Sequence, residues 1–213
     1  MPLRTKKTIY LIRHGQTDYN NQGIIQGSGV DSDLNETGRL QARAFHKHFG
    51  YLQFDAIYTS QLKRTHQSIQ PFLETGYLHK SLPELNEINW GKFEGLRSTP
   101  ELHAEYLKLI KDWREGRLNS KIPGGESPEQ MYLRQLAALE ILLRQRHEER
   151  VLICSHGRYM RAFLCTLTNV PLENMDDFEH SNLCLYVLDQ IDEKRFEISV
   201  RHETGHLEGL GLP

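Results

Sequence analysis

Cysteine is scarce in this sequence, and no run of apolar residues is long. The three cysteines, Cys154, Cys165 and Cys184, lie in apolar segments and form no C-x-x-C pair. We therefore interpret them as buried, reduced thiols rather than as disulfide partners or metal ligands. No apolar run approaches the roughly 18 residues that span a bilayer, and residues 1–7 adjoin no apolar signal core. These absences predict a cytoplasmic protein without a membrane partner.

An excess of charge of one sign is also absent, because 26 lysines and arginines face 28 aspartates and glutamates. A chain without a basic field has no general attraction for nucleic acid, so we expect no nucleic-acid partner. An anionic ligand would need locally clustered arginines and histidines. The 11 histidines leave a metallohydrolase open as an alternative, although no H-E-x-x-H motif occurs and His202 and His206 lie in a polar tail. We accordingly expect no metal.

Two segments of the chain present an imidazole at the end of an apolar, β-rich run. Residues 8–12 lead directly into Arg13, His14 and Gly15, and residues 151–154 lead into Ser155, His156 and Gly157. A strand that delivers a cation, an imidazole and a glycine to its carboxyl end is typical of a phosphate-handling site. The recurrence of the pattern indicates that both segments serve one site.

Strand and helix patterns alternate along the rest of the chain. They predict further strands at residues 55–59, 79–82, 183–188 and 195–200, and helices at residues 40–49, 61–70, 101–115, 128–147 and 158–167. Ser60 and Ser127 are the predicted N-caps of the second and fourth of these helices. The alternation predicts an α/β protein, a three-layer α/β/α sandwich with an open, mostly parallel central sheet. No long linker occurs, so we expect a single domain over residues 1–213, with a small helical cap at roughly residues 92–125.

This architecture predicts where the site lies. Ligands of open α/β sheets bind outside the carboxyl ends of the strands. Arg13 and His14 follow the first strand, Arg64 lies one helical turn beyond the strand at 55–59, and His156 follows the strand at 151–154. If these strands are parallel neighbours, the four side chains converge at one edge.

Two histidines and two arginines with a nearby carboxylate can transfer a phosphoryl group without a metal. The histidine nitrogen attacks only in its neutral form, so its other nitrogen should donate to a backbone carbonyl that sets the tautomer. Gly15 would let the backbone approach the phosphate closely. The planar forks of Arg13 and Arg64 match phosphate oxygens better than lysines would.

In these motifs the chain resembles the histidine phosphatase superfamily, which contains the cofactor-dependent phosphoglycerate mutases and many phosphomonoesterases. The resemblance covers most of the chain, and its ordered series of motifs is specific where a lone Arg-His-Gly would not be. The matching segments are residues 13–17 with Asn20, Gln26 with Gly27, residues 31–38, residues 59–64, Glu87 with Trp90, Gly91, Glu94 and Gly95, residues 123–127, and residues 155–157. The resemblance implies the phosphoglycerate mutase-like version of the predicted fold.

The resemblance also implies roles for individual residues. His14 would be phosphorylated transiently, Arg13, Arg64 and His156 would bind the phosphoryl group, and Glu87 would be the proton donor. A carboxyl group beside a dianionic phosphate has its charged form disfavoured, which supports the last role independently. Glu94 and Asp18 are alternatives for it. The further residues expected to bind substrate or phosphate are Gly15, Asn20, Gln26, Gly27, Trp90, Gly157 and Arg158.

Arg158 departs from the family pattern, which commonly has a small residue there. Its side chain either projects toward the pocket, which would favour an anionic substrate, or points outward into solvent, and the sequence leaves both readings open. The other departures are Asp33, Asn35 and Thr65, and none removes a catalytic group.

The segment between Leu96 and Pro123 is shorter than the basic insertion that retains a bisphosphate in the mutases. We therefore predict a cofactor-free phosphoric monoester hydrolase, a histidine acid-type phosphatase acting on a small phosphorylated metabolite. A phosphoglycerate mutase and a non-catalytic phospholigand-binding module remain alternatives. Phosphoglycerates, phosphoserine, α-ribazole phosphate and sugar phosphates are candidate substrates that the sequence does not separate, and a homodimer is left open.

Overall fold

The computed structural model describes residues 6–210, so the greater part of the amino-terminal segment 1–7 and the last three residues of the predicted domain lie outside the described residues. The centre of the fold is a six-stranded sheet with the strand order β3-β2-β4-β1-β5-β6. The strands are β1 (Thr8–Arg13), β2 (Ala56–Thr59), β3 (His79–Ser81), β4 (Arg150–Ser155), β5 (Leu185–Gln190) and β6 (Phe196–Glu203). The pairs β1/β4, β2/β4 and β2/β3 are parallel, whereas β1/β5 and β5/β6 are antiparallel.

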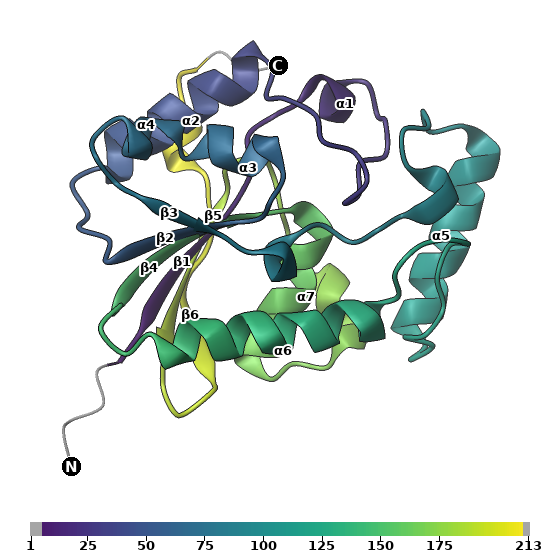
Figure 1. Ribbon diagram of the computed structural model, residues 1–213. Coiled ribbons are helices and arrows are strands. Elements are labelled where there is room, and N and C mark those ends of the chain that lie inside the picture. Colours follow the sequence, from purple (N-terminus) through teal and green to yellow (C-terminus); the bar gives the residue numbers. More distant parts are fainter. Residues whose placement is uncertain (1–5, 211–213) are drawn as a thin grey trace.

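Helices cover both faces of this sheet (Figure 1). In Figure 1, α2 (Glu36–Phe49), α3 (Lys63–Ser68) and α4 (Gln70–Leu73) lie on one face, and α6 (Pro128–Arg144) and α7 (Gly157–Thr168) lie on the other. The remaining elements are α1 (Asp18–Asn21), α5 (Pro100–Arg114) and the 3-10 turns η1 (Pro83–Leu85), η2 (Gly91–Phe93), η3 (Leu172–Asp177) and η4 (Gly205–Leu207). The predicted α/β class with a mostly parallel open sheet is confirmed.

The strands separate two apolar clusters because successive side chains of a strand point to opposite faces. In β1, Leu11 belongs to the cluster beneath α6 and α7, and Ile12 belongs to the cluster beneath α2 and α4. Both side chains are completely buried. The central parallel strands β1, β2 and β4 are therefore covered on both sides, as an α/β sheet requires, whereas the edge strand β3 is largely exposed.

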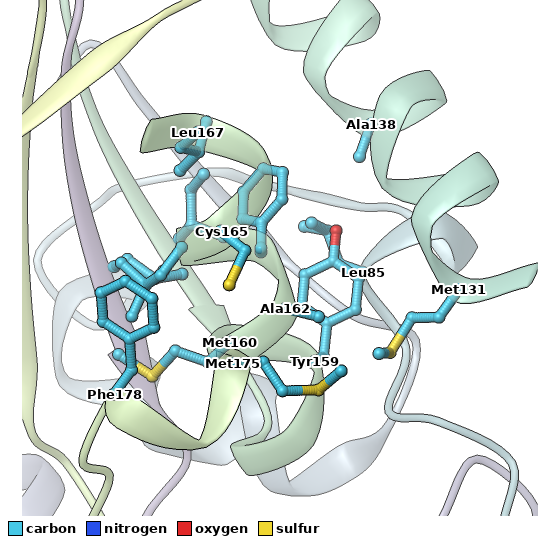
Figure 2. Packing of buried hydrophobic residues seen from close by; sticks show 14 of the residues in the cluster. Leu85, Met131, Ala138, Tyr159, Met160, Ala162, Cys165, Leu167, Met175 and Phe178 are labelled. Carbon is cyan, nitrogen blue, oxygen red and sulfur yellow. The ribbon is translucent and has the colours of Figure 1, made fainter. Parts of the chain in front are cut away.

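Helix α7 begins at the second imidazole motif, and nine of its twelve residues are buried. Figure 2 shows Tyr159 and Ala162 of α7 on the side that faces Met131 and Ala138 of α6. All four residues have no exposed surface. In addition, the Gln135 side-chain amide donates to the Tyr159 carbonyl oxygen at 3.0 Å. The start of α7 is therefore held firmly against α6.

The helix after β2 differs from its prediction in a way that affects the site. It begins at Lys63 rather than at residue 61, because Leu62 has extended backbone angles, and a second short helix follows at Gln70. Ser60 is consequently not the N-cap. Its hydroxyl instead accepts from the Leu62 N–H at 3.1 Å. Ser127 does cap its helix, with a capping box completed by Gln130, although that helix ends at Arg144 rather than at residue 147.

The three cysteines are free and buried, as predicted. None of the helices within residues 6–210 is long and apolar enough to cross a membrane. The segment predicted as a cap contains α5, which stands to one side of the sheet in Figure 1. Its function as a cap stays a prediction.

Candidate active site

His14 is the first residue beyond β1, and its ring is oriented by the chain itself. The ring Nδ1 donates to the Gly15 carbonyl oxygen at 2.8 Å, as the sequence predicted. The proton therefore lies on Nδ1 and leaves the lone pair of Nε2 available. Burial lowers the pKa of His14 well below its usual value, and the charges of Arg64 and Arg13 lower it further. His14 is thus neutral at pH 7 and can act as a nucleophile through Nε2.

His156 lies beside His14, with the two ring centroids 5.2 Å apart. Its Nδ1 accepts from the Arg64 Nε at 3.2 Å, so the proton of the neutral ring lies on Nε2 and is donated to the Ser60 hydroxyl at 2.8 Å. Burial, followed by the charge of Arg64, lowers the pKa of His156 well below its usual value. Both nitrogens of this ring are used within the protein, and direct binding of a phosphoryl group by His156 stays a prediction.

Arg64 organises the loop that faces the two histidines. It is completely buried, and its two terminal nitrogens donate to the Val30 carbonyl oxygen at 2.6 Å and the Gly27 carbonyl oxygen at 3.2 Å. Burial lowers its pKa to about 10, which still leaves it charged at neutral pH. A guanidinium has five N–H groups, so two remain for an anionic ligand after these two contacts and the contact with His156. The predicted convergence of His14, Arg64 and His156 is confirmed.

The same loop explains the role of Glu94. A Cβ at Gly27 would lie 1.9 Å from the Glu94 Oε1 atom and 2.6 Å from the Ile88 carbonyl oxygen, and because the second is a backbone atom, only glycine fits where Glu94 packs against the loop. Glu94 also accepts from the Trp90 N–H at 2.9 Å. These contacts support a structural role for Glu94, and its alternative role as the proton donor stays a prediction.

Arg13 reaches the site from the end of β1, next to His14. One terminal nitrogen donates to the His180 Nδ1 at 3.1 Å, and its Nε is buried without a hydrogen-bond partner. His180 packs against the start of α7, where a Cβ at Gly157 would lie 3.0 Å from the ring Cε1 atom. Burial and the charge of Arg13 lower the pKa of His180 to about 2, so the ring accepts from Arg13 as a neutral group.

The sequence reasoning missed three polar residues at this edge, namely Ser60, His180 and Asn182. The Asn182 amide donates to the His14 carbonyl oxygen at 2.9 Å and to the Asn20 Oδ1 atom at 3.3 Å. Both His180 and Asn182 precede β5, which is antiparallel to β1, so its amino-terminal end lies at the edge where β1 ends. An antiparallel assignment for this strand would have been the signal that reveals them.

Glu87 lies at the amino-terminal end of α7 and is 7% exposed. Its Oε1 atom accepts from the N–H groups of Ile88 at 3.0 Å and Tyr159 at 2.8 Å, and its Oε2 atom accepts from the Arg158 N–H at 3.1 Å. Its charge acts on both Arg13 and Arg64. A carboxyl group is therefore held within electrostatic range of the two arginines.

Asn20 and Gln26 are engaged in the loop around α1. Asn20 forms a capping box with Thr17, and the Gln26 amide donates to the Thr17 hydroxyl at 2.8 Å. Gln26 also accepts from the Ser32 hydroxyl. These contacts fix the loop, and contact of either side chain with substrate stays a prediction.

The Arg158 side chain does not point into solvent, since it is only 6% exposed. Its terminal nitrogens donate to the Asp176 carboxylate at 2.7 Å and the Tyr106 hydroxyl at 2.6 Å, and its guanidinium lies 5.4 Å from the Trp113 ring centroid. Trp113 in turn stacks on Trp90 at 5.8 Å between centroids. The outward reading is therefore wrong, because the aromatic side chains of α5 cover Arg158. The Asp176 carboxylate pairs with its charge.

Asp176 joins α7 to η3, since its Oδ1 atom also accepts from Arg161 at 2.6 Å. Asp176→Asn should lower the free energy of unfolding by about 3 kcal/mol, because two guanidinium groups lose a largely buried counter-charge. Urea denaturation at pH 7 measures this. Glu140→Ala, which removes an exposed partner of Arg144 on α6, is the matched control and should change stability by less than about 0.5 kcal/mol. Equal effects of the two substitutions would contradict the prediction.

Within residues 6–210, no three side chains of histidine, cysteine, aspartate or glutamate are grouped so as to hold a metal ion. His14 is a neutral imidazole with an available nitrogen, and beside it lie a second imidazole, His156, and the guanidinium charges of Arg13 and Arg64. This set of groups is able to bind and accept a phosphoryl group.

Comparison with known proteins agrees with this chemistry. The chain is 30% identical over 200 residues to phosphoserine phosphatase 1 of Hydrogenobacter thermophilus, covering 93% of each chain. It is 33% identical over 170 residues to the metal-independent phosphoserine phosphatase of Arabidopsis thaliana, covering 75% of this chain and 68% of the relative. The solved structure of a mycobacterial glucosyl-3-phosphoglycerate phosphatase superimposes with a TM-score of 0.81 at 25% identity, covering 93% of this chain and 100% of that one. Residues 9–204 match the profile of the histidine phosphatase superfamily (branch 1), and the chain belongs to that family.

Proposed function

We propose that this protein hydrolyses small phosphomonoesters through a phosphohistidine intermediate on His14, without a metal. The observation that carries the proposal is the orientation of the His14 ring. Its Nδ1 proton is donated to the Gly15 carbonyl oxygen, so Nε2 is the nucleophilic nitrogen, and two arginines lie close enough to lower its pKa. The relatives named above support a small phosphorylated metabolite as the substrate.

The first step transfers the phosphoryl group to the protein. The lone pair of the His14 Nε2 forms a bond to phosphorus while the bond between phosphorus and the ester oxygen breaks. Glu87 in its protonated form gives its proton to the departing oxygen, so an alcohol leaves rather than an alkoxide. Arg13 and Arg64 balance the charge of the three remaining phosphoryl oxygens.

The second step returns His14 to its starting form. Glu87, now ionised, takes a proton from water as the water oxygen attacks phosphorus and the bond to Nε2 breaks. Inorganic phosphate leaves, and the imidazole is neutral again. Glu87 thus ends the cycle protonated, and the two steps balance in atoms and charge.

Phosphate release in the presence of a chelator tests the proposal. The protein should release phosphate from p-nitrophenyl phosphate and from a panel of sugar and amino-acid phosphates, and excess EDTA should leave the rate unchanged, because no step uses a metal. Protein quenched during turnover should carry a phosphoryl group that is labile in acid and stable in alkali, as a phosphoramidate is.

Two results would overturn this assignment. Loss of activity with EDTA that is restored by a divalent cation would favour a metallohydrolase. Absence of phosphate release together with bisphosphate-stimulated isomerisation of phosphoglycerate would favour a mutase.

The α5 segment closes the site as a cap, which the contact of Arg158 with Tyr106 supports. The protein is cytoplasmic, which its three free cysteines support. A homodimer stays a prediction.

A further inference from the structure

Arg134 lies on α6, outside the groups that converge on His14, yet it is bound to the loop that carries Glu87. One of its terminal nitrogens donates to the carbonyl oxygens of Glu84 at 2.9 Å and Asn86 at 2.7 Å. The other donates to the carbonyl oxygen of Glu87 itself at 3.2 Å. A single guanidinium therefore binds three main-chain carbonyls within four residues of the loop.

These contacts contribute to the conformation of the loop. Beyond η1, residues 86–90 form neither helix nor strand, so their backbone groups are not paired by regular structure. Glu87 and Arg134 also line a pocket of about 370 Å³, so packing does not enclose the loop on this side. Hydrogen bonds to Arg134 take the place of packing there.

Glu126 fixes the position of the Arg134 guanidinium. Its two carboxylate oxygens accept from the Arg134 Nε at 2.7 Å and from a terminal nitrogen at 2.8 Å, and the two side chains are 17% and 21% exposed. This bidentate geometry needs the planar fork of an arginine. The Glu126 N–H also donates to the Asn89 carbonyl oxygen at 2.8 Å. Glu126 therefore holds both the arginine and the far end of the loop.

Arg134 also contacts the residue that binds the Glu87 carboxylate. Its guanidinium lies 5.1 Å from the ring centroid of Tyr159. The Tyr159 N–H donates to the Glu87 Oε1 atom at 2.8 Å. The main chain of Glu87 and one donor to its carboxylate thus share a single side-chain neighbour.

From these contacts we infer that Arg134, held by Glu126, is a positioning residue that aims the Glu87 carboxyl at the leaving oxygen. The inference rests on the proposed function. Arg134 acts through the loop and not on the substrate, so its removal displaces the acid while leaving His14, Arg13 and Arg64 in place. The effect should then depend on how much the leaving group needs a proton.

The experiment compares two substrates in Arg134→Met. p-Nitrophenolate is stable as an anion and needs little help from an acid, whereas the alkoxide from glycerol 2-phosphate must be protonated. The ratio kcat/KM, which reports the transfer to His14, should fall by about 100-fold for the alkyl ester and less than about 10-fold for the aryl ester. For the alkyl ester, a general acid makes kcat/KM fall as the pH rises and the acid loses its proton. This fall should be absent in Arg134→Met. Arg144→Met is the matched control, because Arg144 lies on the same helix in an exposed pair with Glu140, and it should leave both substrates unaffected.

Equal losses for both substrates with an unchanged pH profile would mean that Arg134 is merely structural, and would overturn the inference. If Arg134→Met does not fold, Arg134→Lys answers the same question, because an ammonium group keeps the charge but has no fork for Glu126 and the three carbonyls. Failure of the unaltered protein to release phosphate from either ester would reject the proposed function instead.

Discussion

His14→Ala should lower kcat by at least about 10⁴-fold and still leave inorganic phosphate bound. The reason is that different side chains at this edge of the sheet form the covalent bond and bind the anion. Nε2 of His14 forms the covalent bond, whereas the guanidinium groups of Arg13 and Arg64 supply the attraction for the anion. Phosphate release from p-nitrophenyl phosphate measures the first effect, and titration calorimetry with inorganic phosphate measures the second.

His147→Ala is the control for this experiment, because His147 is an exposed histidine in the turn that follows α6. It should match the unaltered protein in both measurements. Residual activity of His14→Ala above about 1% would contradict a phosphohistidine mechanism. Binding of phosphate by the unaltered protein without any turnover would favour the phospholigand-binding module.

Acidification from pH 7 to pH 5 should destabilise the protein by up to about 6 kcal/mol. Burial lowers the pKa values of His14 and His156 well below their usual range and lowers that of His180 to about 2. In the unfolded chain each of these histidines takes up a proton near pH 6.5, but in the folded protein it does not. Their contribution to stability is therefore complete above about pH 6.5 and decreases as the pH falls toward the folded-state values.

A histidine that stays neutral in the folded protein contributes about 2 kcal/mol to this change at pH 5, so the effect of one can be isolated. Urea denaturation of the unaltered protein and of His180→Asn at pH 7, 6 and 5 measures it. The variant should lose about 2 kcal/mol of the pH dependence between pH 7 and pH 5, because the lowered pKa of His180 no longer contributes. Equal stability of the unaltered protein at pH 7 and pH 5 would show that these histidines take up protons as readily in the folded protein as in the unfolded chain, and it would contradict their lowered pKa values.

The fold class and the centre of the site follow from local features of the sequence. Apolar runs of strand length ended by Arg13 and His14, and again by His156, indicate two parallel strands that deliver polar groups to one edge. The structure has β1 and β4 as neighbours, with His14 and His156 in ring contact and Arg64 between β2 and the loop at Gly27. Periodicity and motif spacing suffice here, because each group lies within a few residues of the strand that positions it.

Groups that depend on distant partners could not be predicted in this way. The spacing of Ser60 suggests an N-cap, and only the late start of α3 at Lys63 makes its hydroxyl available to His156. For Arg158 the sequence left both an inward and an outward orientation open. The structure decides between them, because Arg158 donates to the Tyr106 hydroxyl of α5. Local propensity does not predict such contacts, because they join segments about 50 to 100 residues apart in the sequence.

By itself, the sequence determined the α/β alternation, the convergence of His14, Arg64 and His156, and the neutral tautomer of the nucleophile. Only the tertiary structure decided that β5 runs antiparallel to β1, which brings His180 and Asn182 to the site, and that Arg134 reaches across from α6 to the loop of Glu87. The physical reason is that strand and helix formation depend on neighbouring residues. Strand direction and the pairing of buried charges depend instead on how the whole chain packs.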